Sequence, residues 1–170
     1  MNSNSNENFV KFSRPFIQAL KETFSLMVQT EIQAHSPKIK TSSITHGDIT
    51  AIIGMNGTLE SSGEIKDFRG QISISFSKDV YIKIASRMLM EEYTEYSDEI
   101  SDVGAEIINI VMGNAKKDLA PLGYKIGMAT PSTFRGKDLE MKSSKNTTTI
   151  ETTISADLGN FILEINYQEI

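Results

Sequence analysis

The sequence predicts an α+β fold in which helices pack on one antiparallel sheet. Two observations lead to this prediction. Apolar residues recur at helical spacing in three segments before residue 120, whereas the chain after this point has β-branched, threonine-rich runs separated by turn residues. A helix, a group of strands, two more helices and a second group of strands therefore follow one another, which is typical of helices layered on an antiparallel sheet.

The composition limits the class of protein. The 170 residues fit one domain, which can bury a core without disulfides. The chain has no cysteine, so thiolate metal sites are excluded. It has only two histidines, His35 and His46, and neither has further candidate ligands close by in the sequence, so no metal site is expected at either. The net charge of −5 comes from scattered charges, which excludes a nucleic-acid footprint, and no apolar run approaches the roughly 18 residues of a membrane span.

The N-terminus is polar and rich in Asn and Ser, without the layout of a signal peptide. We therefore expect residues 1–9 to be a disordered polar tail, residues 10–170 to form a single domain, and the protein to be cytoplasmic. The first helix is expected from Val10 to about Ala34, where apolar residues recur at helical spacing, namely Phe16, Leu20, Phe24, Met27 and Val28.

Strands are expected at Ile49–Leu59 and Gln71–Phe76, with turns at Gly63 and Gly70. A second helix follows the entry signal Ser77-Lys78-Asp79. A third helix is expected from Asp98 to Leu119. The later strands are predicted at Ile126–Ala129, Leu139–Met141, Thr147–Ile154 and Phe161–Tyr167.

The third helix sorts into two stripes at about 100° per residue. The apolar stripe, expected to face the core, contains Ile100, Ile107, Ile108, Val111, Met112, Ala115 and Leu119. The opposite stripe contains Asp102, Glu106, Asn109, Gly113 and Lys116. Glu106 and Asn109 are three residues apart and therefore neighbours on the helix surface. By itself such a pair is weak support for a function, because a polar helix face is ordinarily just solvated.

Gly113 lies one turn beyond Asn109 in the polar stripe, although glycine inside a helix costs about 1 kcal/mol relative to alanine. In one interpretation the bare backbone lets another protein approach closely. In the other, a second helix of the same chain crosses at this point. Spacing alone does not distinguish the two.

The stretch from Asp102 to Lys116 resembles the CheC/CheX/FliY family of chemotaxis phosphatases. The shared pattern is E-x-x-N followed by G-x-A-K, formed here by Glu106, Asn109, Gly113, Ala115 and Lys116. The segment from Thr130 to Lys137 resembles the one that follows this helix in CheX, and the order of elements over nearly the whole chain also fits CheX.

Members of the CheC type usually carry two E-x-x-N helices, whereas this chain has one. In the first helix Glu22 is followed three residues later by Ser25, and Glu31 by Ala34. The resemblance therefore points to CheX-like proteins, which act as homodimers that pair through the sheet region and hydrolyse the aspartyl phosphate on the response regulator CheY. The late strands would then be interface candidates.

The resemblance implies roles for the two residues. Asn109 would orient the attacking water, and Glu106 would dock against a lysine in the regulator's active site. Asp102, Gly113 and Lys116 would be partner contacts, although Asp102 and Lys116 also suit the helix dipole where they stand. The protein would need no cofactor of its own, because the regulator carries Mg²⁺.

Two alternatives remain. The first is a non-catalytic CheX-like dimer that binds a response regulator or a flagellar-motor component without hydrolysis, against which the intact Glu106 and Asn109 argue. The second is a structural or signalling dimer that shares only the fold. In that case Glu106 and Asn109 would be dispensable.

Overall fold

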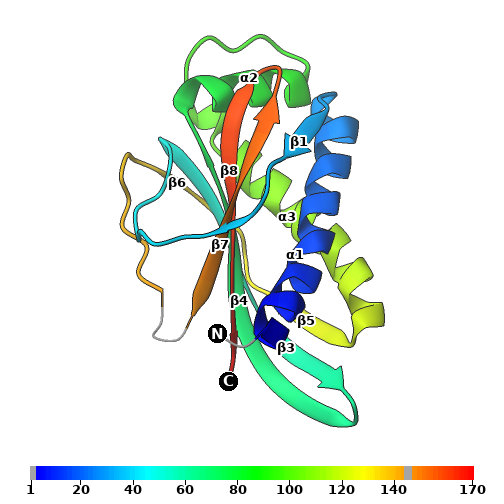
Figure 1. The fold of residues 1–170 in the computed structure, drawn as a ribbon. Coiled ribbons are helices and arrows are strands. Elements are labelled where there is room, and N and C mark those ends of the chain that lie inside the picture. Colours follow the sequence, from blue (N-terminus) through cyan, green and yellow to red (C-terminus); the bar gives the residue numbers. More distant parts are fainter. Residues whose placement is uncertain (1–2, 144–146) are drawn as a thin grey trace.

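The computed structural model describes residues 3–143 and 147–170. In this part of the chain, α1 and α3 lie side by side against one face of an antiparallel sheet, as Figure 1 shows, so the predicted fold class is confirmed. The helices are α1 Ser3–Thr23, α2 Lys78–Leu89 and α3 Val103–Leu119, with short helical segments η1 Phe24–Val28, η2 Asp98–Ile100 and η3 Ala120–Leu122. The strands are β1 Ile32–Ala34, β2 Lys38–Ile39, β3 Ile49–Ser61, β4 Glu64–Phe76, β5 Tyr124–Met128, β6 Ser132–Arg135, β7 Thr148–Ala156 and β8 Gly159–Glu169.

The first helix differs from the prediction at both ends. It begins at Ser3, so residues 3–9 are helical rather than a disordered tail, and residues 1 and 2 lie outside the described residues. Phe9 and Phe12 pack against Tyr167 of β8 at ring-centroid distances of 6.4 and 4.8 Å, which ties the early turns to the sheet. The helical run ends at Val28, before a left-handed residue, and Ile32–Ala34 form β1 instead of the end of the helix.

Strands β3 and β4 form a long hairpin that turns at Gly63, as predicted. The alternating residues Ile49, Ala51, Ile53 and Met55 are all buried, which confirms the predicted core face of β3. The turn predicted at Gly70 is wrong, because Gly70 lies inside β4 opposite Met55. A Cβ atom there would lie 2.4 Å from the carbonyl oxygen of Asn166. Glycine at this position permits the close approach of β8 rather than a change of direction.

The sheet order is β1-β7-β8-β4-β3-β5, with β2 beside β7 and β6 beside β3. Strands β5, β7 and β8 confirm three of the predicted late strands. The strand predicted at Leu139–Met141 is wrong, since among the described residues this segment forms only an isolated bridge, between Glu140 and Ile44. The short strands β1, β2 and β6 were not predicted. They span two to four residues, too few for an alternating pattern to be recognised.

The second helix begins at the predicted position, and the third ends at the predicted residue, Leu119. The Oγ of Ser77 accepts the backbone N–H of Val80 at 3.3 Å and caps α2. The third helix starts later than expected, because residues 98–100 form a 3₁₀ turn before α3. After α3 the chain turns at Gly123, where φ is 93°. None of the helices among the described residues is long and apolar enough to cross a membrane.

Candidate functional site

The two faces of α3 separate as the sequence predicts. The predicted apolar stripe is fully buried against the sheet and α1. On the opposite face Asp102, Glu106 and Asn109 are exposed, and Gly113 and Lys116 are half-buried. All five predicted site residues therefore belong to one helix surface, and that surface is open to a partner.

The side chains of Glu106 and Asn109 have no partner within the described part of the chain: no hydrogen bond or ion pair joins either of them to another side chain or to the backbone. The carboxylate of Glu106 and the amide of Asn109 are therefore available to an incoming molecule. A carboxylate offers only acceptors, whereas the amide offers both an acceptor and donors. One turn of helix thus presents two chemically different groups side by side.

Gly113 faces open space. A Cβ atom built on Gly113 would have no described atom within 4 Å outside its own helix backbone and neighbours. The interpretation in which another helix of the same chain crosses at Gly113 is therefore wrong for the described residues. The remaining interpretation is a bare stretch of backbone beside Asn109.

A buried tyrosine from α2 fixes the start of α3. The hydroxyl of Tyr81 accepts the Gly104 N–H at 2.9 Å and lies 2.9 and 3.0 Å from the carbonyl oxygens of Ile100 and Ser101. Burial raises the pKa of Tyr81 to about 12. Sequence reasoning did not assign a role to Tyr81, whose partners follow it by some twenty residues.

Gly104 allows Tyr81 to pack this closely against the start of α3. A Cβ atom at this position would lie 3.1 Å from Cβ of Ala51, 3.2 Å from Cε2 of Tyr81 and 3.3 Å from Oγ1 of Thr133. The sequence does contain one indication of such close packing, because Gly104 lies in the first turn of the helix on the side opposite the polar stripe. Together Tyr81 and Gly104 set how deeply α3 sits on the sheet, two residues before Glu106.

The segment from Thr130 to Lys137, which carries part of the resemblance, contains β6 and borders the start of α3. The guanidinium carbon of Arg135 lies 4.7 Å from the ring centroid of Tyr96, a cation–π contact. Phe134 is 48% exposed. An aromatic and a cationic side chain therefore lie on the strand beside the N-terminal end of α3.

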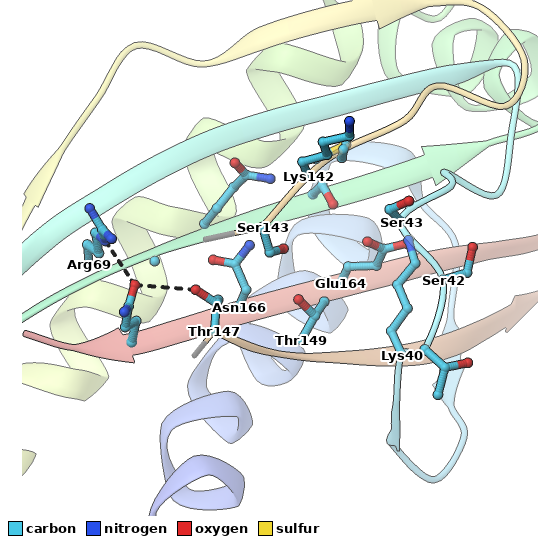
Figure 2. A pocket seen from close by; sticks show the side chains of 16 residues that line it. Lys40, Ser42, Ser43, Arg69, Lys142, Ser143, Thr147, Thr149, Glu164 and Asn166 are labelled. Atoms are coloured by element: carbon cyan, nitrogen blue, oxygen red, sulfur yellow. Dashed lines mark hydrogen bonds and ion pairs between the residues drawn. The ribbon is translucent and has the colours of Figure 1, made fainter. Parts of the chain in front are cut away.

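The other face of the sheet has a polar hollow of about 570 Å³, shown in Figure 2. It lies over β4, β7 and β8, and its lining includes Lys40, Arg69, Thr149, Glu164 and Asn166. None of the five predicted site residues lines it. The hollow and the polar stripe of α3 are thus separate surfaces of the molecule.

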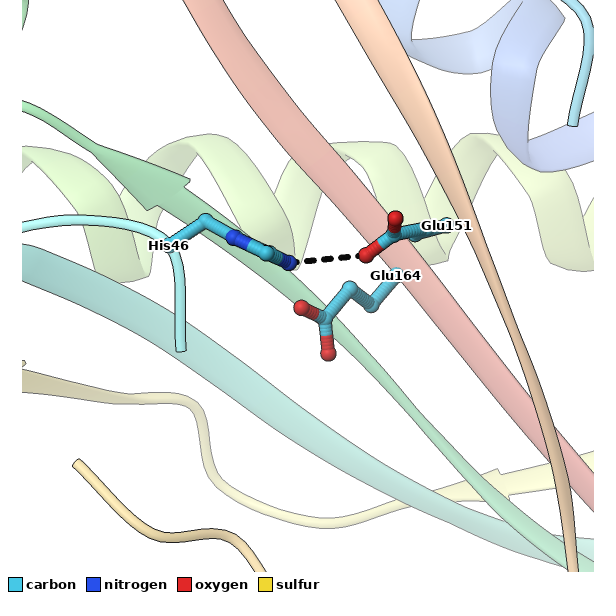
Figure 3. Close-up of side chains that lie close together, drawn as sticks. All are labelled: His46, Glu151 and Glu164. Carbon is cyan, nitrogen blue, oxygen red and sulfur yellow. Dashed lines mark hydrogen bonds and ion pairs between the residues drawn. The ribbon is translucent and has the colours of Figure 1, made fainter. Parts of the chain in front are cut away.

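The two histidines have different surroundings. Nε2 of His35 lies 2.6 Å from Oγ of Ser155. Nε2 of His46 lies 2.8 Å from Oε2 of Glu151, with Glu164 close by (Figure 3). The spacing of the sequence could not reveal this group, because β7 and β8 follow His46 by more than one hundred residues.

The comparisons with known proteins agree with this fold. A family model described as "Chemotaxis phosphatase CheX" matches residues 49–155. A CheX chemotaxis protein from Vibrio vulnificus is 30% identical with a TM-score of 0.79, covering 93% of this chain and 99% of that one. A CheC-like superfamily protein from Shewanella sp. PV-4 is 27% identical with a TM-score of 0.79, covering 99% of both chains.

A third solved structure, a CheX–CheY–BeF3–Mg²⁺ complex from Borrelia burgdorferi, shares the fold at 23% identity and a TM-score of 0.72, covering 93% of this chain and 97% of that chain. No protein among the curated sequences matches the chain. The family match covers more than half of the sequence and includes the whole of α3. This chain therefore belongs to the CheX family of chemotaxis phosphatases.

Proposed function

We propose that this protein accelerates hydrolysis of the aspartyl phosphate on a CheY-type response regulator, with the polar stripe of α3 inserted into the regulator's active site. The observation that carries the proposal is the pair Glu106 and Asn109, exposed one turn apart and without partners among the described residues. Such a surface can meet a second protein without first breaking contacts of its own. The complex of the Borrelia burgdorferi relative with CheY, BeF3 and Mg²⁺ supports this class of partner.

Asn109 is the proposed catalytic residue. In the reaction, water attacks phosphorus, the bond from phosphorus to the aspartyl oxygen breaks, and inorganic phosphate leaves while the carboxylate is restored. The acyl phosphate is already reactive, so hydrolysis chiefly needs a water held in line with that bond. The amide oxygen of Asn109 accepts a hydrogen bond from the water, and the uncharged amide is not repelled by the phosphoryl oxygens.

Glu106 is assigned to docking. A carboxylate next to the phosphoryl group would be repelled, so it suits a position slightly away from the phosphorus. There it would pair with the lysine that the family resemblance places in the regulator's active site. A charge-assisted hydrogen bond of this kind fixes position as well as adding affinity. The regulator supplies Mg²⁺ and the phosphoryl group, while this chain supplies positioning.

The rest of the stripe would widen the contact. Asp102 and Lys116 lie at its two ends, and Gly113 leaves room for the regulator's backbone beside Asn109. In this proposal Asp102 and Lys116 affect affinity, and neither touches the reacting atoms.

We also propose that the protein acts as a homodimer in the cytoplasm. Strands β7 and β8 have no free edge in the described sheet, because β8 lies between β7 and β4 and the outer edge of β7 carries β1 and β2. If β7 and β8 take part in the dimer, they do so through the face of the sheet rather than by extending it.

The proposal is tested by measuring binding and phosphate release with the same samples. The wild-type protein is mixed with a phosphorylated regulator from the same organism and Mg²⁺, and phosphate loss is compared with that of the regulator alone. We expect faster loss, and weaker binding for a Glu106→Lys variant. Binding without any acceleration would favour the non-catalytic CheX-like protein, and unchanged affinity of Glu106→Lys would remove the docking role.

A further inference from the structure

Two buried carboxylates lie opposite one another on the face of the sheet that α3 does not cover. Glu151 of β7 and Glu164 of β8 are direct cross-strand partners, and they are only 8% and 5% exposed. Like charges in directly opposite positions destabilise a sheet, and burial increases the cost. A pair of this kind needs cations around it.

Two lysines supply part of this compensation. Nζ of Lys38 lies 3.1 Å from Oε1 of Glu151, and Nζ of Lys40 lies 2.6 Å from Oε1 of Glu164. Each lysine holds one oxygen of its carboxylate. The second oxygen of Glu151 faces His46, and the second oxygen of Glu164 accepts no hydrogen bond from any described residue.

The free sides of these groups converge. Figure 3 shows the imidazole of His46 directed at the carboxylate of Glu151, with the carboxylate of Glu164 beside this pair. One donor atom from each of the three side chains lies within 4.8 Å of the others. Zinc bonds of about 2.0–2.2 Å place neighbouring donor atoms of a tetrahedral site roughly 3.4 Å apart. Sharing an ion therefore requires the most distant donors to approach by at most about 1.4 Å, and His46 and Glu151, now 2.8 Å apart, to separate slightly.

We propose that His46, Glu151 and Glu164 bind one divalent transition-metal ion of the zinc class. The ion replaces the direct hydrogen bond between His46 and Glu151, and each carboxylate ligates through the oxygen that its lysine does not hold. A water molecule completes the coordination on the solvent side, where His46 is 44% exposed. One imidazole nitrogen with two carboxylate oxygens suits Zn²⁺, whereas Mg²⁺ and Ca²⁺ prefer six or more oxygens.

The charges around the cluster act in opposite directions. The two carboxylates attract a dication, and coordination by these ligands requires ionised carboxylates and a neutral imidazole. The two ammonium groups oppose an incoming dication, so we expect weaker binding than for the same ligands without lysines nearby.

Metal binding would attach one loop to the sheet. His46 lies in the connection between β2 and β3, whereas both glutamates lie on long central strands. An ion held by all three stabilises the folded state in proportion to its occupancy. This proposal is independent of the phosphatase mechanism, because Glu106 and Asn109 lie on the helix-covered side of the sheet.

The test is calorimetric titration of the chelator-treated full chain with ZnCl₂, together with thermal unfolding. We expect one saturable site per chain, and a melting temperature that rises with zinc. His46→Ala should lower the affinity at least tenfold and remove the shift in melting temperature. His35→Ala is the matched control, because the other histidine bonds only Ser155 among the described residues, and it should bind as the wild type does.

A second variant and a second metal complete the design. Lys38→Gln removes one opposing charge and should tighten zinc binding, while Co²⁺ should give a four-coordinate visible spectrum that His46→Ala abolishes. Asn109→Ala should bind zinc normally even if it loses phosphatase activity. Absence of a saturable site in the wild type, equal binding by His46→Ala, or weaker binding by Lys38→Gln would each overturn the proposal.

Discussion

The hydroxyl of Tyr81 accepts the backbone N–H of Gly104 at 2.9 Å. The same hydroxyl shares its proton between the carbonyl oxygens of Ile100 and Ser101. One side chain of α2 therefore holds the connection that leads into α3 together with the first turn of that helix. Glu106 follows two residues later, so the direction in which the polar stripe faces depends on this contact.

Tyr81→Phe should lower both stability and phosphatase activity. The variant keeps the ring but leaves a buried N–H and two carbonyl groups short of a partner, which costs about 1–3 kcal/mol. Denaturant unfolding measures the loss of stability. If α3 shifts as proposed, the kcat/KM for regulator dephosphorylation falls at a temperature where the variant is fully folded. A folded variant with unchanged kcat/KM would show that Tyr81 does not position the stripe.

The hydroxyl of Tyr81 also predicts a change of stability at high pH. Its pKa is about 12 in the folded protein, above the ordinary value near 10, because burial disfavours the charged form. The favourable contribution is therefore complete below pH 10 and is lost as the pH rises toward 12, by at most about 1.4 kcal/mol per pH unit. The stability difference between wild type and Tyr81→Phe should narrow over this range. A constant difference between pH 9 and 12 would contradict the assignment.

The two glycines of α3 should respond in opposite directions to alanine. Gly104→Ala places a methyl group 3.1–3.3 Å from three neighbours, so we expect destabilisation of about 1–2 kcal/mol by overpacking. Gly113→Ala meets open space and removes the helix penalty of glycine, so it should stabilise by about 0.5–1 kcal/mol. Thermal and urea unfolding of both variants check the two signs.

A larger residue at Gly113 should separate stability from partner binding. Gly113→Leu adds a side chain to the polar stripe one turn beyond Asn109, at a position where a Cβ atom meets no described atom within 4 Å outside its own helix backbone and neighbours. We expect a folded protein with at least tenfold weaker affinity for the activated regulator, measured by titration. Asp118→Leu is a suitable control, since Asp118 is exposed on the same helix and lies about 140° around its axis from Gly113. Equal affinities of the two variants would mean that the regulator does not approach Gly113.

The sequence predicted those helices and strands in which apolar residues recur at a regular spacing over many residues. The alternation from Ile49 to Met55 and the stripe of α3 each contain enough residues for their period to be recognised. Gly70 and the strand β6 were missed because they are defined by pairing with distant strands, whose approach no local pattern encodes. Residues 3–8 are polar, but the packing of the Phe9 ring against Tyr167 ties their helix to the sheet.

The candidate site follows the same rule. Glu106 and Asn109 could be found because their spacing and the resemblance lie within one helix. Tyr81, by contrast, contributes through a hydrogen bond to a backbone group on another helix. The cluster of His46, Glu151 and Glu164 joins three segments that meet only after the sheet has formed. Sequence reasoning finds groups that one element presents, and structure is required for groups that the fold assembles.

Asn109 is the residue proposed to place the attacking water. We would measure release of inorganic phosphate from a regulator phosphorylated in advance, with Mg²⁺ and substoichiometric amounts of this protein. Asn114, off the predicted stripe on the same helix, supplies the matched control. We expect Asn114→Ala to retain the wild-type rate and Asn109→Ala to lose on the order of 100-fold, while still binding the BeF3-activated regulator. Wild-type turnover by Asn109→Ala would contradict the proposed mechanism.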